Sequence, residues 1–336
     1  MKLNSIFSDN MILQANKPIF VFGTGQGEVV IEIAGHRSET VSEGDQWTVM
    51  LSAVDYGGPY TLKATLNGVE NELKNVYFGD VYLFGGQSNN QLKLEQTNTP
   101  KELYRNCDSI RLFTVDRLED EEYYHSKDGW VSAEKDSVGF WPALGYLTAD
   151  LLVKSKDRKI GVIACYQGAS MIQSWIPADL QCETPLCVPL ERRSPSAICP
   201  KYNWNGDGTL YEYMLKTILP FALKAVIWYQ GESNYRGDDS SSEIYGGLLS
   251  LLIHTWRRKF NDPSLPFLII QIHDYMPRIN EAGSGWRRIQ ETQQSVCNTV
   301  KNTHLIKSAD VSETDDIHPV SKFPLALRIA EVLKTL

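Results

Sequence analysis

The residues Val-Tyr-Leu-Phe at 81–84 run directly into Gly-Gly-Gln-Ser-Asn-Asn at 85–90. Four successive apolar residues are typical of a strand that is buried on both faces of a sheet. The two glycines allow a tight turn and a close approach to a neighbouring backbone. In a doubly wound sheet, ligands bind beyond the carboxyl ends of the strands. The pattern therefore predicts a strand that delivers Ser88 to a ligand-binding edge.

Four further apolar segments have the character of buried strands and lie at 109–115, 160–164, 225–228 and 266–271. Helical periodicity is found at 144–154, 210–223, 244–260 and 323–336. Pro220 is expected to end or kink the second of these helices. Strands that alternate with helices predict an α/β protein, in which helices cover both faces of a mostly parallel sheet.

The first part of the chain has a different pattern, with short strands between turn residues. These strands are expected at 18–22, 29–33, 47–51 and 60–66. Asn67-Gly68 suits a type I′ hairpin, in which both central residues need a positive φ. The glycines at 23, 25 and 27 lie between strands, which excludes a phosphate-binding loop. We therefore predict a small β-sandwich-like domain at 1–76 and an α/β domain at 77–336.

Charge and hydropathy exclude several classes of partner. The 336 residues carry a formal net charge of −8 and a pI near 5.4. Without a basic field, binding to nucleic acid or to an anionic membrane surface is not expected. No apolar run reaches the ~18 residues of a membrane span. The first residues lack a secretory leader, so we expect a cytoplasmic protein, or a secreted one if a leader has been removed.

The six cysteines are too sparse for a disulfide framework in a chain of this length. Cys182, Cys187 and Cys199 form a cluster, but a zinc site would need a fourth ligand and closer spacing. We interpret them as free thiols in a loop and predict neither a metal nor another cofactor. The acidic run at 119–122 is interpreted as a solvated loop.

Ser88 is the first candidate for chemistry, because its turn follows a buried strand. Asn90 stands where the G-x-S-x-G motif has its second glycine, which disfavours the nucleophile elbow of α/β-hydrolases. Taken alone, a serine at this position is more simply interpreted as a helix cap.

A second candidate motif is Thr-Asp-Asp-Ile-His-Pro at 314–319. In a turn, an Asp three residues before His318 can hold the imidazole Nδ1–H while Nε2 faces a serine. The simpler alternative is a surface turn with an incidental histidine. The other five histidines have no comparable neighbours and are expected to be structural or exposed: His36, His125, His254, His273 and His304.

Two more polar turns follow predicted strands, Tyr-Gln-Gly-Ala-Ser at 166–170 and Trp-Tyr-Gln-Gly-Glu-Ser-Asn at 228–234. Acyl transfer needs hydrogen-bond donors aimed at a developing oxyanion. The backbone N–H of Gly168 and a side-chain amide of Gln230 or Asn234 are candidates. Because turns after parallel strands converge on one edge of the sheet, we expect these groups to lie near Ser88.

Together these motifs resemble those of the SGNH hydrolase superfamily, and nearly the whole chain is similar to the sialate O-acetylesterase family. The segments that carry this likeness are 6–14, 110–115, 226–234, 256–258 and 316–319. The resemblance implies a flavodoxin-like three-layer α/β/α hydrolase domain with a small N-terminal β domain. It also implies metal-free hydrolysis of O-acetyl esters on sugars.

Carried over by position, the resemblance implies that Ser88 is the nucleophile and His318 the base. The Asp-x-x-His spacing selects Asp315 as the orienting acid, and the likeness of 316–319 to the family leaves Asp316 open as the alternative. The resemblance also implies a set of oxyanion-stabilising and substrate-binding residues: Gln87, Gly168, Gln230, Glu232 and Asn234. The sequence departs from the family at Asn90, which is usually Met, and at Ala169, which is usually Gly.

Two alternatives to a sialate esterase stay open at this point. The same chemistry can remove acetyl groups from plant oligosaccharides, such as xylan, mannan or xyloglucan fragments, because a fold does not determine its substrate. A sugar-binding protein without activity is the other, although the complete set of catalytic residues disfavours it. Trp175, Trp228 and Tyr229 are candidates for stacking against a sugar, with core packing as the alternative for Trp228.

Overall fold

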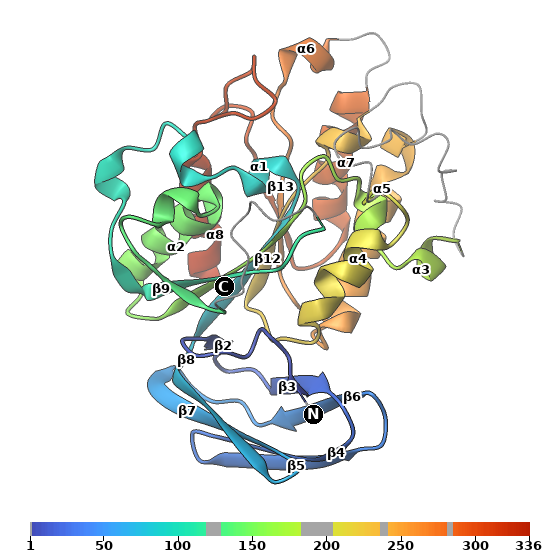
Figure 1. The fold of residues 1–336 in the computed structure, drawn as a ribbon. Helices are drawn as coiled ribbons and strands as arrows, with labels where there is room; N and C mark the ends of the chain where they lie inside the picture. Colours follow the sequence, from blue (N-terminus) through green and yellow to red (C-terminus); the bar gives the residue numbers. More distant parts are fainter. Residues whose placement is uncertain (1, 119–128, 183–203, 236–240, 281–284) are drawn as a thin grey trace.

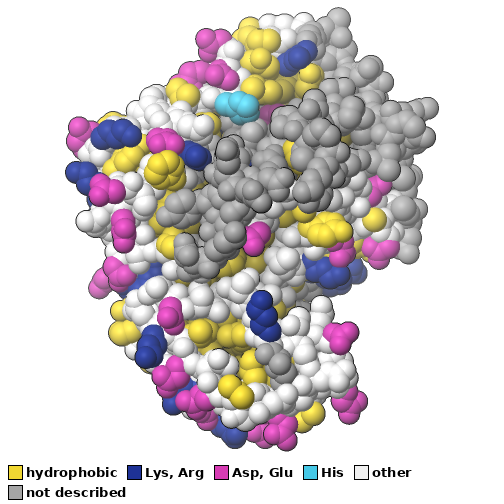
Figure 2. All heavy atoms as spheres, viewed as in Figure 1, with side chains coloured by type: hydrophobic (Ala, Val, Ile, Leu, Met, Phe, Trp, Pro, Cys, Tyr) yellow, Lys and Arg dark blue, Asp and Glu magenta, His cyan; other side chains and the backbone are white. Residues whose placement is uncertain are grey.

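The computed structural model describes residues 2–118, 129–182, 204–235, 241–280 and 285–336. An α/β unit lies above a smaller β unit, with the N-terminus in the smaller one (Figure 1). No helix in these ranges is both long and apolar enough to cross a bilayer. Acidic and basic side chains are interspersed over the β unit on the face drawn in Figure 2.

The central sheet has the strand order expected for a flavodoxin-like protein. Its order is β10 (Val131–Ala133), β9 (Cys107–Thr114), β11 (Ile160–Tyr166), β8 (Val69–Gly86), β12 (Ala225–Tyr229), β13 (Phe267–Ile270) and β14 (Thr303–Ile306). Every neighbouring pair from β9 to β14 is parallel, and β10 alone in this row is antiparallel. Without the edge strands β9 and β10, the order is 2-1-3-4-5, as in flavodoxin-like folds.

Helices cover both faces of this sheet, which confirms the three-layer prediction. α2 (Ala143–Ser155) and α8 (Phe323–Thr335) pack together on one face, and α5 (Ser241–Lys259) and α7 (Gly285–Thr299) pack on the other (Figure 1). Strands β11, β12 and β13 are buried at every position. That burial explains why their sequences are continuous apolar runs. Short helices lie in the connections: α1 (Ser88–Gln91), α3 (Ala178–Cys182), α4 (Thr209–Tyr213) and α6 (Met276–Ile279).

The N-terminal unit is all β, as predicted. Its strands are β1 (Lys2–Leu3), β2 (Ile12–Gln14), β3 (Ile19–Thr24), β4 (Gly27–Ile33), β5 (His36–Ser42), β6 (Gln46–Leu51) and β7 (Gly57–Leu66). β1, β3 and β6 form one sheet, and β4, β5 and β7 join the lower part of β8. Asn67 and Gly68 have φ values of 50° and 77° in the hairpin between β7 and β8, as that turn requires.

One long strand, β8, belongs to both units. Its Val76 pairs with Tyr60 of β7, and further along Tyr82 pairs with Val162 of β11. The boundary expected at 76/77 therefore lies inside a continuous strand. The strand that ends beside Ser88 therefore begins in the β unit.

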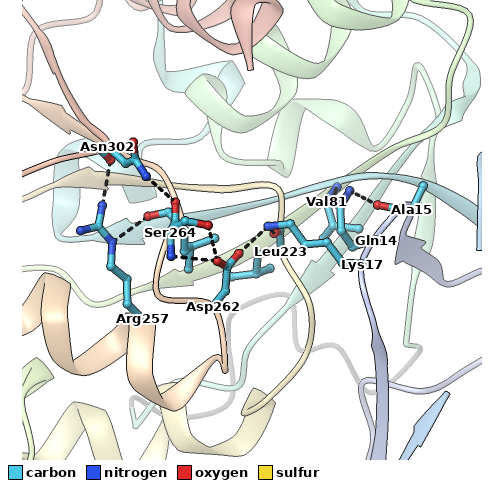
Figure 3. Close-up of polar contacts among 10 residues, drawn as sticks. Gln14, Ala15, Lys17, Val81, Leu223, Arg257, Asp262, Ser264 and Asn302 are labelled. Carbon is cyan, nitrogen blue, oxygen red and sulfur yellow. Dashed lines mark hydrogen bonds and ion pairs between the residues drawn. The ribbon is translucent and has the colours of Figure 1, made fainter. Parts of the chain in front are cut away.

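The β unit contacts the sheet at its amino-terminal edge. Lys17 Nζ donates to Asp262 Oδ2 and to the Leu223 carbonyl, both at 2.6 Å. The Gln14 side chain accepts from the Val81 N–H at 2.8 Å (Figure 3). Val81 lies before the end of β8, and Leu223 and Asp262 precede β12 and β13. The contact is thus at the opposite edge of the sheet from Ser88.

Some sequence expectations were wrong in extent. The helix expected at 210–223 is only α4 followed by a 3-10 turn at Leu215–Ile218. Pro220 disfavours helical backbone in the residue before it, so the helical structure ends at Ile218. Helix α7 was missed, since most of its side chains are polar and only one face is buried. The 119–122 run and residues Cys187 and Cys199 lie outside the described residues.

Candidate active site

The turn after β8 is forced by Gly86. Its φ is 131°, and a Cβ on it would lie 2.1 Å from the Tyr229 carbonyl oxygen. On either side of the turn, the Gln167 N–H donates to the Gly86 carbonyl and the Gln87 N–H donates to the Tyr229 carbonyl, both at 3.0 Å. Where it leaves the sheet, the chain is therefore hydrogen-bonded to residues at or just after the ends of both neighbouring strands. Helix α1 then begins at Ser88.

Ser88 and His318 lie in hydrogen-bond contact. The imidazole Nε2 is 2.8 Å from Ser88 Oγ. His318 lies between β14 and α8, so the two residues come from the connections after the first and last strands of the doubly wound order. This distance suits transfer of the hydroxyl proton to the imidazole, which activates a serine as nucleophile.

The surroundings of His318 favour the neutral form of its imidazole. Burial lowers its pKa below the usual value, and the nearby Lys322 ammonium acts in the same direction. The Asp316 carboxylate opposes them. A general base has to be unprotonated before it can act, so a lowered pKa extends its working range to lower pH.

The structure does not bring Asp315 to His318. Asp315 is exposed and has no hydrogen bond to the imidazole. Its neighbour Asp316 instead accepts the His318 backbone N–H at 2.8 Å through Oδ1, as in an Asx turn. Among the described residues no side chain is bonded to Nδ1 of His318. No contact with His318 therefore supports Asp315 as the orienting acid, because its side chain is exposed to solvent.

The backbone N–H groups of Ser88 and Gly168 are candidates for binding an oxyanion. A Cβ on Gly168 would lie 3.8 Å from Ser88 Cβ and 3.1 Å from Gln91 Oε1, so this backbone passes close to the Ser88 turn. Neither the Ser88 N–H nor the Gly168 N–H is bonded to another described residue. Such N–H groups can stabilise a tetrahedral oxyanion.

Gln230 and Asn234 do not reach the catalytic pocket. Both are 0% exposed. Gln230 donates to the Ser170 carbonyl and to Asn234 Oδ1, and Asn234 donates to Gln173. Since these amides are already bonded inside the protein, they brace the loop that carries Gly168. The expectation that one of them is a side-chain oxyanion donor is not supported by their positions.

Gln87 and Glu232 join two of the turns below the pocket. Gln87 Oε1 accepts the Ser233 N–H at 3.3 Å. Glu232 is 2% exposed yet borders the pocket, and its Oε1 accepts from Asn89 Nδ2 at 2.6 Å. Burial raises the pKa of the Glu232 carboxyl.

The three aromatic candidates for sugar stacking are core residues. Trp175, Trp228 and Tyr229 are each 0% exposed. The Trp175 and Trp228 rings pack edge to face with centroids 5.8 Å apart. Strand β12 is central and covered on both faces, so its side chains cannot meet a ligand.

A cavity of about 800 Å³ opens above Ser88 and His318. Its lining includes cationic Lys93 and Arg117 together with the exposed ring of Phe140. The described residues that line it lie between 87 and 318, and the described N-terminal strands contribute nothing to this lining.

Several residues of the site were missed from the sequence, notably Asn89, Gln91, Arg117 and Lys322. Asn89 and Gln91 belong to the Ser88 turn, but their type alone does not show which one faces the pocket. Arg117 follows β9 and could have been found by the rule that located the other turns. In the described ranges, no three His, Cys, Asp or Glu side chains are arranged to hold a metal ion. The absence of a cofactor stays a prediction.

A 2-1-3-4-5 sheet, a serine after its first strand and a histidine after its last strand define a serine ester hydrolase of the SGNH type. A family model described as carbohydrate esterase, sialic acid-specific acetylesterase matches residues 78–332. The chain belongs to this family, and it is a carbohydrate O-acetylesterase.

Individual relatives agree with this family. The sialate O-acetylesterase of Mus musculus is 26% identical over 389 residues, covering 96% of this chain and 71% of that protein. That of Homo sapiens is 26% identical over 371 residues, covering 97% and 69%. The crystal structure of a carbohydrate acetylesterase from Xanthomonas citri has a TM-score of 0.81 at 27% identity, covering 98% of this chain and 73% of that one.

Proposed function

We propose that this esterase removes O-acetyl groups from a sialic acid, with Ser88 as nucleophile and His318 as base. The observation that carries the substrate choice is the charge of the pocket. Lys93 and Arg117 line it, and the one carboxylate among the lining residues that the structure describes is the almost fully buried Glu232. Cationic side chains of this kind favour a sugar that bears a carboxylate.

The reaction proceeds by two acyl transfers. Ser88 Oγ attacks the acetyl carbonyl carbon while its proton passes to His318 Nε2. The resulting oxyanion accepts hydrogen bonds from the N–H groups of Ser88 and Gly168. As the carbon–oxygen bond to the sugar breaks, His318 gives the proton to the sugar oxygen. Water then attacks the acetyl-enzyme with His318 again as base, and acetate leaves as Ser88 regains its proton.

Deacetylation of plant oligosaccharides is the second candidate, and Phe140 is the observation that favours it. This ring is 46% exposed at the pocket and could pack against the face of a neutral sugar. Lys93 Nζ lies 5.4 Å from the ring centroid, so the same place also offers a cation.

An acetate-release assay separates the two candidates. An O-acetylated sialic acid should be hydrolysed with higher kcat/KM than acetylated xylo-oligosaccharides. Arg117→Gln should raise KM for the sialic acid by about tenfold, the loss expected for one hydrogen bond to a charged group. The same variant should affect p-nitrophenyl acetate far less, because that ester has no carboxylate. Preference for the xylo-oligosaccharide with no effect of Arg117→Gln would favour the second candidate.

A further inference from the structure

A buried chain of hydrogen bonds connects the serine segment with the histidine segment. Lys322 Nζ donates to Asn89 Oδ1 at 2.7 Å. Asn89 Nδ2 donates to Glu232 Oε1 at 2.6 Å and to the Ile317 carbonyl at 2.9 Å. Asn89 follows Ser88 in the sequence, and Ile317 precedes His318. The side chain of the residue after Ser88 is therefore hydrogen-bonded to the residue before His318.

The two charged members of this chain are hidden from water. Lys322 and Asn89 are 1% exposed and Glu232 is 2% exposed. Within the described residues, Glu232 Oε2 has no hydrogen-bond partner. Burying charges is costly, and well-packed apolar side chains often stabilise a core as well or better. Fold stability alone is therefore a poor reason for two charges here.

The three hydrogen bonds fix the orientation of the Asn89 amide. Its oxygen accepts from an ammonium, and its NH₂ group donates to a carboxylate and a carbonyl. Turned over, the amide would place its NH₂ against the ammonium and its oxygen against the carboxylate. Both contacts would then be repulsive, because Lys has donors only and an ionised Glu has acceptors only.

We propose that Lys322 and Glu232 act through Asn89 as positioning residues that hold Ser88 and His318 at hydrogen-bond distance. The proposal rests on Ser88 and His318 being the reacting pair. Lys322 and Glu232 touch no reacting atom in it. Their effect passes through Asn89 to the α1 turn on one side and to the Ile317 carbonyl on the other.

Lys322 also acts on His318 through its charge. The carboxylates of Glu232, Glu313 and Asp316 attract the ammonium, while burial lowers its pKa to about 7. The ammonium in turn lowers the pKa of the His273 and His318 imidazoles. A charged Lys322 thus helps His318 to remain an unprotonated base.

Lys156 provides a matched control. It is half-buried, whereas Lys322 is almost fully buried, and burial lowers the pKa of both lysines. Lys156 follows α2, and Lys322 precedes α8. Lys156 donates to the Leu333 carbonyl near the end of α8. The same Lys→Met substitution at both positions therefore tests two lysines that lie at opposite ends of α8, of which only Lys322 contacts the proposed unit.

The experiment compares Lys322→Met, Glu232→Gln and Lys156→Met in the full chain, with p-nitrophenyl acetate as substrate. Lys322→Met and Glu232→Gln should lower kcat per folded molecule by about 10²-fold, the usual effect of a small misplacement of reacting groups. KM should change little. Lys322→Met should also move the acidic limb of the pH–rate profile to higher pH, because His318 loses a neighbouring cation. Lys322→Arg should restore part of kcat.

Unchanged kcat in both variants would overturn the proposal. So would a loss of thermal stability with kcat per folded molecule and pH profile equal to those of Lys156→Met, because that result fits a structural role alone. If Lys322→Met does not fold, the nearly isosteric Glu232→Gln gives the answer. Ser88→Ala separates the assumptions, because activity in that variant would reject the reacting pair itself.

Discussion

Nε2 of His318 lies 2.8 Å from Oγ of Ser88, although 230 residues separate them in the chain. Ser88 follows β8 and His318 follows β14, at the carboxyl edge of one parallel sheet. The sheet itself thus brings the two together, and the hydrogen-bonded turns hold them there.

Ser88→Ala should lower kcat for p-nitrophenyl acetate by roughly 10⁴-fold or more, as expected for loss of a catalytic nucleophile. Folding should be retained, because Ser88 lies in a half-buried polar turn. Steady-state kinetics and thermal unfolding measured on the same sample check both statements. If Ser88→Ala kept more than about a hundredth of the activity, Ser88 would be excluded as the nucleophile.

The pH dependence of kcat/KM should report His318. Burial lowers its pKa below the usual value, and only the unprotonated imidazole acts as base. Activity should therefore rise with pH along a limb centred below about pH 6.5, the usual histidine value. A profile measured from pH ~4 to ~9 locates the limb, and a midpoint above the usual value would contradict the neutral-base assignment.

Asp316→Asn should affect the enzyme more than Asp315→Asn. Asp316 holds the His318 N–H, and its charge raises the pKa of that imidazole. The amide oxygen of an Asn can still accept this N–H, so the main expected effect is that loss of the charge shifts the acidic limb to lower pH. Asp315→Asn is the matched control, since that exposed carboxylate has no bond to His318. If Asp315→Asn were the inactive variant, the orienting acid would be the one that the Asp-x-x-His spacing indicates.

Dialysis against EDTA should leave activity unchanged, because the proposed mechanism draws every catalytic group from the protein. Acetate release before and after dialysis, with zinc or manganese added back, is the measurement. Activity that disappears with EDTA and returns with either ion would reject the serine mechanism.

Gly86→Ala should impair both folding and activity. A Cβ at this position would lie 2.1 Å from the Tyr229 carbonyl oxygen, and the φ of 131° disfavours any other residue. The free energy of unfolding should fall by more than about 1 kcal/mol, the cost of a side chain at an incompatible backbone position. Gly35→Ala is a suitable control, because its φ is also positive at 80° but nothing lies within 4 Å. Similar unfolding temperatures for the two variants would show that the contact with Tyr229 is unimportant.

Much of the fold could be predicted because its signals are local. Buried parallel strands such as β11 and β12 need apolar side chains on both faces, so they stand out as apolar runs. The hairpin at Asn67-Gly68 needs two positive φ values, and Asn followed by Gly is the residue pair that most often adopts them. Helix α7 escaped prediction because its buried face includes the polar Gln293.

For the site, local sequence patterns were enough to show which segments meet, since turns after parallel strands share one edge of the sheet. Ser88, His318 and Gly168 were found in this way. What each side chain contacts there became known only from the folded chain. Gln230 and Asn234 are turned into the core, Asp315 points to solvent, and Lys322 is drawn inward to Asn89. The physical reason is that the direction of a polar side chain depends on partners supplied by segments far away in the chain, which no local pattern records.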